Sequence, residues 1–247
     1  MKRLLILGGT AEARALAAAI AETLPGRAEA VTSWAGRTGR APDVAGATRV
    51  GGFGGGAGMV DYIKSEGIDI VIDATHTFAE TISDHAHDAA LIAEVPRLCL
   101  MRPPWRLPPG SRWVEVADLE AAAEAVGKFA KRVFLTSGRQ TLEAFAGIKD
   151  VWFLVRLIDP PAEPLALAAY EVATGRPPFT IEHEKALMAE HNIDTLVSKS
   201  SGGPLPAKIT AAVELGLPIV LIAPPPPVPG TRADSVATAL EWIELQL

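Results

Sequence analysis

The chain has 247 residues, of which 49% are hydrophobic and 21% are charged, and its formal net charge is −6. This composition is typical of a globular protein, and the lack of a basic tail argues against general binding of nucleic acid. A single cysteine, Cys99, excludes an internal disulfide, and the absence of a signal-peptide pattern or of an apolar run of roughly 18 residues predicts a cytoplasmic protein with no membrane span.

Short aliphatic runs alternate with segments rich in alanine, leucine and glutamate along the whole chain. This alternation predicts α/β units around mostly parallel sheets. The expected strands cover residues 3–7, 28–33, 69–74, 97–101, 132–136, 151–156, 194–198 and 218–222. The expected helices lie near residues 11–23, 58–66, 80–93, 118–129, 140–146, 182–190, 206–215 and 234–245.

The motifs of the first half return in the same order in the second half. "KRLLILGGTAEARALA" is matched by "KRVFLTSGRQTLEAFA", and "IDIVIDATHTFAE" is matched by "IDTLVSKSSGGPL". Each half then continues through a proline-led strand and a proline-rich stretch to a helix. The alternative is that the two halves look alike only because all α/β domains share a similar pattern of strands, turns and helices. We predict two similar Rossmann-like domains with an active-site cleft between them, covering residues 1–130 and 131–247.

The loops after the strands matter most, because ligands of open α/β sheets bind beyond the carboxyl ends of the strands. In the first loop, Gly8 and Gly9 form a tight turn before a helix that would offer N–H groups to a phosphate. Gly8 and Ala13 fit the dinucleotide fingerprint G-x-G-x-x-G/A, but Thr10 replaces its middle glycine. Thr10 either donates its hydroxyl to phosphate or only caps the helix of a plain strand–helix turn.

The second strand lacks the terminal carboxylate that binds the ribose 2′-hydroxyl in NAD-dependent folds. Ser33 and Arg37 offer instead a hydroxyl and a cation, which would hold the extra phosphate of NADP. This loop therefore favours NADP over NAD, unless it is only a solvated basic loop. The glycine-rich stretch 51–58 either wraps a ligand or is a mobile connection before a helix that starts near Met59.

The stretch "DATHTFAE" places polar side chains directly after an apolar strand. Asp73 is expected to hold the turn, and Thr75 and His76 to face the ligand. His76 is either a proton donor or a structural histidine. Since no cluster of cysteine and histidine occurs, we expect no metal site.

Two loops of the second half carry groups that suit an anion. The first is "LTSGRQ", with Arg139 and Gln140 at a helix start, and the second is "VSKSSGG", followed by Lys208. The spacing G-x-x-x-x-G-K-[ST] of a P-loop is absent, which argues against a kinase or an ATPase. The motif G-x-S-x-G is absent as well, which argues against a serine hydrolase.

Taken together, these motifs resemble the precorrin-6A reductase family of cobalamin biosynthesis over essentially the whole chain. They are, in order, "LGGTAEAR", "GGFGG", "DATHTFAETIS", "RPPW", "LTSGRQ" and "VSKSSGG". Small departures are "ATHTFA" for the usual "ATHPFA" and "SKSSGG" for "TKNSGG". The last strand also ends "IAPPPP", without the arginine that the family tends to carry there.

The resemblance implies two Rossmann-like domains, NADPH as cofactor and reduction of one double bond of an anionic tetrapyrrole to give precorrin-6B. Hydride transfer belongs to the cofactor, so the protein must bind, orient and supply charge. The expected cofactor-binding residues are Gly8, Gly9, Thr10, Ser33, Arg37 and Thr75. The expected substrate-binding residues are Arg40, Arg139, Gln140, Ser200, Ser201, Gly202 and Lys208. His76 and Lys199 are the expected proton donors, with water or a substrate carboxyl group as the alternative.

Two other functions stay open at this point. The first is an NADP-dependent reductase of another substrate, although the Tyr-x-x-x-Lys pair of short-chain dehydrogenases is absent. The second is a regulatory module that senses NADP, against which the cations of the second-half loops argue. The metal state of the ring is also open, and we expect transient contacts with neighbouring enzymes of the pathway.

Overall fold

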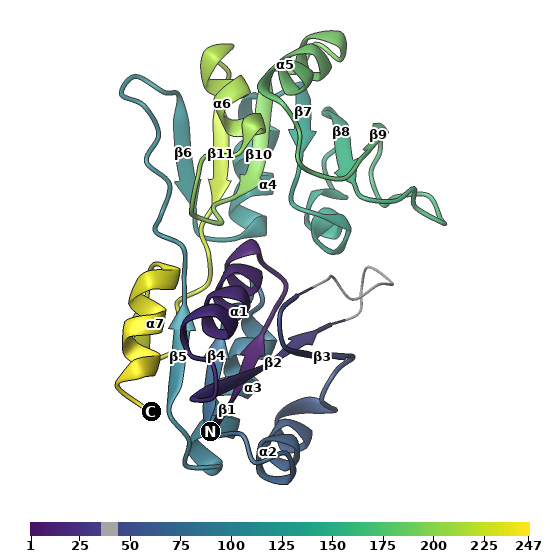
Figure 1. Cartoon of the computed structure of the whole chain (residues 1–247). Helices are drawn as coiled ribbons and strands as arrows, with labels where there is room; N and C mark the ends of the chain where they lie inside the picture. The colour runs from purple at the N-terminus through teal and green to yellow at the C-terminus, as the bar shows by residue number, and fades with distance from the viewer. Residues whose placement is uncertain (36–43) are drawn as a thin grey trace. The chain divides into compact units, whose positions relative to one another are not determined.

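The computed structural model in Figure 1 describes residues 1–35 and 44–247. The chain forms two compact units, the first of residues 1–103 and 225–247 and the second of residues 104–224. Each unit contains a six-stranded sheet in which all neighbouring strands run parallel. The predicted pair of Rossmann-like α/β domains is thereby confirmed. No helix in the described part of the chain is long and apolar enough to cross a bilayer.

The sheet of the first unit has the strand order β3-β2-β1-β4-β5-β12. Helices α1 and α7 cover one face and α2 and α3 the other (Figure 1). Along β1, Leu4 and Ile6 pack under α1 and α7, whereas Leu5 and Leu7 pack under α2 and α3. A strand buried on both faces must be apolar at every position, which explains the run "LLIL". The strands are β1 (Lys2–Leu7), β2 (Ala28–Trp34), β3 (Ala47–Val50), β4 (Ile70–Asp73), β5 (Arg97–Leu100) and β12 (Thr231–Ala233). The helices are α1 (Ala11–Thr23), α2 (Gly55–Ser65), α3 (Glu80–Ile92) and α7 (Val236–Glu244).

The sheet of the second unit repeats this plan, with the order β9-β8-β7-β10-β11-β6. Phe134 and Leu196 from the two central strands pack with Met188 and Ile209 from two helices on one face of the sheet. The strands are β6 (Trp113–Val116), β7 (Arg132–Leu135), β8 (Trp152–Leu157), β9 (Tyr170–Thr174), β10 (Thr195–Lys199) and β11 (Ile219–Ile222). The helices are α4 (Leu119–Phe129), the 3₁₀-helix η1 (Arg139–Phe145), α5 (Ile181–Glu190) and α6 (Ala207–Glu214).

The expected domain boundary at residue 130 is wrong, because the two halves exchange their last strand and helix. β6, which is followed by α4, pairs with β11 in the second unit, with Trp113 beside Ile219. β12, which is followed by α7, pairs with β5 in the first unit, with Thr231 beside Leu98. Sheet pairing therefore places residues 104–130 in the second unit and residues 225–247 in the first.

Both sheets have a point where the strand order reverses, between β1 and β4 in the first unit and between β7 and β10 in the second. The first four strands of each order correspond to the 3-2-1-4 core of the dinucleotide-binding fold. Ligands of such sheets bind in the crevice beyond the carboxyl ends of the strands at this point. Functional side chains are therefore expected in the loops after β1 and β4 and in the loops after β7 and β10.

Candidate functional site

The turn after β1 requires glycine at two adjacent positions. The backbone N–H of Gly8 donates to the carbonyl oxygen of Ser33 at 2.8 Å, and an added Cβ would lie 3.1 Å from that oxygen. Gly9 has φ +126°, and an added Cβ there would meet no atom within 4 Å. The turn is therefore packed against β2 on one side and has an open, exposed backbone at Gly9, where an anion can approach the N-terminus of α1.

Thr10 connects the turn after β1 with the turn after β4. Its hydroxyl accepts from the backbone N–H of Ala13 at 3.1 Å and caps α1. The same hydroxyl donates to the carbonyl oxygen of Ala74 at 2.7 Å. The hydroxyl proton is thus used inside the protein, and the donors left for a phosphate are backbone N–H groups of the turn.

Ser33 lies at the end of β2 and is buried, at 6% exposure. Its hydroxyl accepts from Nη1 of Arg49 at 2.8 Å, and the two residues are paired in the parallel ladder of β2 and β3. The predicted Arg37 and Arg40 lie outside the described residues. Arg49 was missed, because the edge strand that carries it has no apolar run to reveal it.

The glycine-rich stretch 51–58 is held to Arg49 by two carbonyl oxygens. Nη1 of Arg49 donates to the oxygen of Gly51 at 3.1 Å, and Nη2 donates to the oxygen of Gly52 at 3.0 Å. Helix α2 begins at Gly55, earlier than the predicted start near Met59. An added Cβ at Gly58 would lie 1.9 Å from the carbonyl oxygen of Phe53, so this glycine allows the loop to fold onto the helix.

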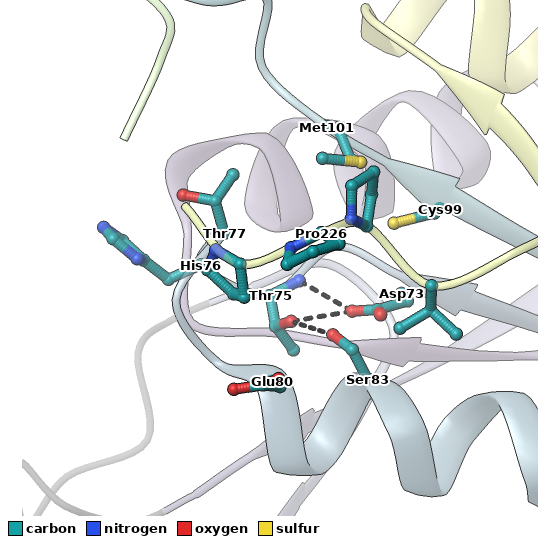
Figure 2. Close-up of a pocket in the computed structure, with 12 residues that line it drawn as sticks. Asp73, Thr75, His76, Thr77, Glu80, Ser83, Cys99, Met101 and Pro226 are labelled. Carbon is teal, nitrogen blue, oxygen red and sulfur yellow. Dashed lines mark hydrogen bonds between the residues drawn. The ribbon is translucent and has the colours of Figure 1, made fainter. Parts of the chain in front are cut away.

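Asp73 organises the turn after β4, as the sequence predicts. Its Oδ1 accepts from the backbone N–H of Thr75 at 3.2 Å and from the Thr75 hydroxyl at 2.7 Å (Figure 2). The hydroxyl oxygens of Thr75 and Ser83 are 3.4 Å apart. Oδ2 of Asp73 lies 3.7 Å from Nη1 of Arg97, and both side chains are buried. Thr75 therefore stands in a fixed orientation at the carboxyl edge of the sheet.

A pocket of the first unit opens beside this turn (Figure 2). Its polar side comes from the turn and from α3, and its apolar side from β5 and a proline run. His76 is exposed, and its Nδ1 accepts from the backbone N–H of Phe78 at 3.3 Å. Cys99 is half-buried, and burial raises the pKa of its thiol to about 11, so the thiol stays protonated at neutral pH. The pocket is lined by Asp73, Thr75, His76, Thr77, Glu80, Ser83, Cys99, Met101, Pro225, Pro226, Pro227 and Val228.

The second unit places two lysines at the carboxyl edge of its sheet. Nζ of Lys208, on α6, donates at 2.8 Å to the hydroxyl of Thr136, which follows β7. Burial lowers the pKa of Lys208 to about 8, against an opposing effect of the Glu184 carboxylate. Lys199 ends β10 and is half-buried, and burial lowers its pKa as well. Both amines therefore lose their proton more readily than a solvated lysine does.

The other predicted residues of the second unit lie in the loops after β7 and β10. Arg139 and Gln140 are exposed at the start of η1. Ser200 is buried, and its backbone N–H donates to the carbonyl oxygen of Ile222 at 2.8 Å. Ser201 is half-buried, and Gly202 has φ +70°.

The predicted residues thus form two groups, one at the carboxyl edge of each sheet. The first unit holds Gly8, Gly9, Thr10, Ser33, Thr75 and His76. The second unit holds Arg139, Gln140, Lys199, Ser200, Ser201, Gly202 and Lys208. The two expected proton donors therefore belong to different units.

Comparisons with known proteins give a consistent result. Residues 3–244 match the family model described as "Precorrin-6x reductase CbiJ/CobK". A precorrin-6A reductase of Rhodococcus erythropolis is 47% identical over 98% of each chain. A solved structure named "CobK precorrin-6A reductase" is 38% identical, covers 100% of this chain and 98% of its own, and superimposes with a TM-score of 0.89. A cobalt-precorrin-6A reductase of Salmonella typhimurium is more distant, at 30% identity over 90% of this chain and 88% of its own.

Proposed function

The chain belongs to the precorrin-6x reductase family, and on that premise we propose that it reduces one double bond of precorrin-6A, with NADPH, to give precorrin-6B in cobalamin biosynthesis. The observation that carries this proposal is the likeness to a named precorrin-6A reductase along 98% of both chains. The test is to mix the protein with NADPH and precorrin-6A and follow NADPH absorbance. Stoichiometric oxidation with a product two hydrogens heavier is expected. NADPH binding without turnover would favour another substrate or a sensing module.

The first unit suits NADPH. The turn at Gly9 leaves room for a pyrophosphate beside the N-terminus of α1. In this fold a dinucleotide lies across the strand reversal, so the adenosine half belongs over β2 and β3 and the nicotinamide half over β4 and β5. Thr75, held by Asp73, and the pocket beside it would position the nicotinamide half. When bound, NADPH supplies the hydride.

The second unit supplies cations for the carboxylate arms of the tetrapyrrole. Lys208 and Arg139 would offer charge, and Gln140, Ser200, Ser201 and Gly202 would add hydrogen-bonding groups in the loops after β7 and β10. Ionic hydrogen bonds of this kind are stronger than neutral ones and fix the face of a ligand. In this proposal the first unit binds the cofactor and the second unit binds the substrate.

Lys208→Met is expected to raise the KM for precorrin-6A about tenfold, because one ionic contact is lost. In the unaltered protein the affinity for substrate should fall as the pH rises through about 8, where Lys208 loses its charge. The variant should lose this step in a plot of KM against pH.

The same substitution, Lys208→Met, should weaken substrate binding but should not lower the stability of the fold. The fold lowers the pKa of Lys208, which costs stability fully below about pH 8 and less as the pH rises toward the pKa of a solvated lysine. Lys208→Met should therefore melt at an equal or higher temperature. Lys131→Met, at an exposed position of the same unit, is the control. An unchanged KM in Lys208→Met would remove this lysine from the substrate site.

A proton must also reach the substrate, and His76 and Lys199 are the proposed donors. If one of them acts, its alanine variant should slow single-turnover oxidation of NADPH about 100-fold or more. The measurement is stopped-flow absorbance with enzyme in excess over precorrin-6A. Rates equal to that of the unaltered protein in both variants would leave water or a substrate carboxyl group as the donor.

The metal-free ring is the preferred substrate in our proposal. A relative named precorrin-6A reductase is 47% identical to this chain, whereas a relative named cobalt-precorrin-6A reductase is 30% identical. Comparing kcat/KM for precorrin-6A with and without cobalt tests this choice. We further propose that the protein works in the cytoplasm, with transient contacts to the enzymes before and after it in the pathway.

A further inference from the structure

Arg49 lies where the adenosine half of the cofactor would end. It stands on β3 beside Ser33, and Ser33 in turn contacts the glycine turn through the bond between its carbonyl oxygen and the N–H of Gly8. In NAD-dependent folds an acidic residue at the end of the second strand binds the ribose 2′-hydroxyl. Here that place holds a serine whose hydroxyl accepts from an arginine.

The guanidinium group of Arg49 is fixed in orientation. Nη1 donates to Ser33 and Gly51, and Nη2 donates to Gly52. The ring of Phe53 lies 3.9 Å from the guanidinium carbon, and the ring of Tyr62 lies 4.9 Å from it. Such stacking and hydrogen bonding hold a planar cation in place before a ligand arrives.

The same contacts leave Arg49 without a countercharge. Its acceptors are a hydroxyl and two carbonyl oxygens, and no carboxylate pairs with it among residues 1–35 and 44–247. Within that part of the chain, Nε–H and one N–H of Nη2 have no acceptor. On one side of a guanidinium, Nε–H and an N–H of Nη2 together can bind two oxygens of a phosphate.

We infer that Arg49, held by Ser33 and the 51–53 loop, binds the 2′-phosphate of NADPH and makes the protein select NADPH over NADH. This inference rests on the proposed function, because it names the group that recognises its cofactor. It assigns to a described residue the role that the sequence predicted for Arg37. It also gives the glycine-rich stretch a purpose, since close approach of the Gly51 and Gly52 carbonyls fixes the guanidinium.

The test measures the dissociation constants of NADPH and NADH by calorimetry, without tetrapyrrole. Arg49→Ala is expected to weaken NADPH binding about 30-fold or more and NADH binding less than about 3-fold. Arg49→Lys keeps the charge but loses the fork, so it should recover only part of the preference. Arg27→Ala, an exposed arginine near the amino end of β2, should leave both constants unchanged.

A fragment pair separates recognition of the phosphate from loss of structure. The unaltered protein should prefer adenosine 2′,5′-bisphosphate to AMP, and Arg49→Ala should bind both equally. If Arg49 only supports the loop, both dinucleotides and both fragments will weaken together, which would overturn the inference. A preference retained in Arg49→Ala but lost in Arg37→Ala would overturn it as well. If the unaltered protein binds neither dinucleotide, the proposed cofactor itself is wrong.

Discussion

Asp73→Ala is expected to lower the free energy of unfolding by about 3–5 kcal/mol and to weaken NADPH binding at the same time. Asp73 is 1% exposed, and the side chain of its partner Arg97 is 6% exposed. Alanine would leave the buried guanidinium of Arg97 without a countercharge. The guanidinium would keep its hydrogen bond to the carbonyl oxygen of Pro229. It would also remove the acceptor that orients Thr75 at the proposed nicotinamide end of the site.

Asp73→Asn separates these two effects. The asparagine oxygen can still accept from Thr75, so NADPH binding should recover. The charge on Arg97 stays uncompensated, so the free energy of unfolding should stay low. Denaturant unfolding gives the stability and calorimetry gives the affinity. The double variant Asp73→Asn, Arg97→Met removes both charges and should be more stable than Asp73→Asn alone. A loss below about 1 kcal/mol in Asp73→Ala would show that this buried pair does not stabilise the fold.

The sequence predicted the central strands well and the edge strands not at all. The eight expected strands are present, and the strands missed among the described residues are β3, β6, β9 and β12, the outermost of the two sheets. A central strand is covered on both faces and needs a continuous apolar run. An edge strand is largely exposed, as Trp113 and Val114 of β6 are, and its sequence carries no such run. Periodicity therefore cannot find it.

The sequence also did not predict that β6–α4 joins the second unit and β12–α7 the first. The repeat in the sequence showed that each half ends in a proline stretch and a helix, but not which sheet that end joins. Pairing of β6 with β11 and of β12 with β5 depends on contacts between residues over 100 positions apart. Local patterns carry no information about such contacts, so the boundary was placed at the end of the repeat.

The sequence predicted which residues belong to the site but not the hydrogen bonds between them. The sequence identified Gly8, Thr10 and Ser33 as members of one edge, and the structure places them at that edge. The sequence did not show that the Thr10 hydroxyl donates to the carbonyl oxygen of Ala74, nor that the Ser33 hydroxyl accepts from Arg49. Both facts follow from the spacing of neighbouring strands, which the order of residues along the chain does not reveal.

The second large effect is expected at Glu184, which lies on α5 and is 1% exposed. Its two oxygens accept from Nη1 and Nη2 of Arg156 at 3.0 and 3.2 Å. The guanidinium carbon of Arg156 also lies 4.1 Å from the ring of Phe179 and 5.1 Å from that of Phe134. Glu184→Ala would leave this cation buried between rings, and we expect a loss of about 3–5 kcal/mol in the free energy of unfolding.

The Glu184 variants also test the link between this pair and the substrate site. Because the Glu184 carboxylate raises the pKa of Lys208, its removal should lower that pKa further below about 8. In Glu184→Gln the rise of KM for precorrin-6A with pH should therefore begin at a lower pH than in the unaltered protein. The double variant Glu184→Gln, Arg156→Met should regain stability, since no unpaired guanidinium remains. A pH profile that does not move in Glu184→Gln, in a folded protein, would mean that Lys208 does not sense this carboxylate and that the pair serves the fold alone.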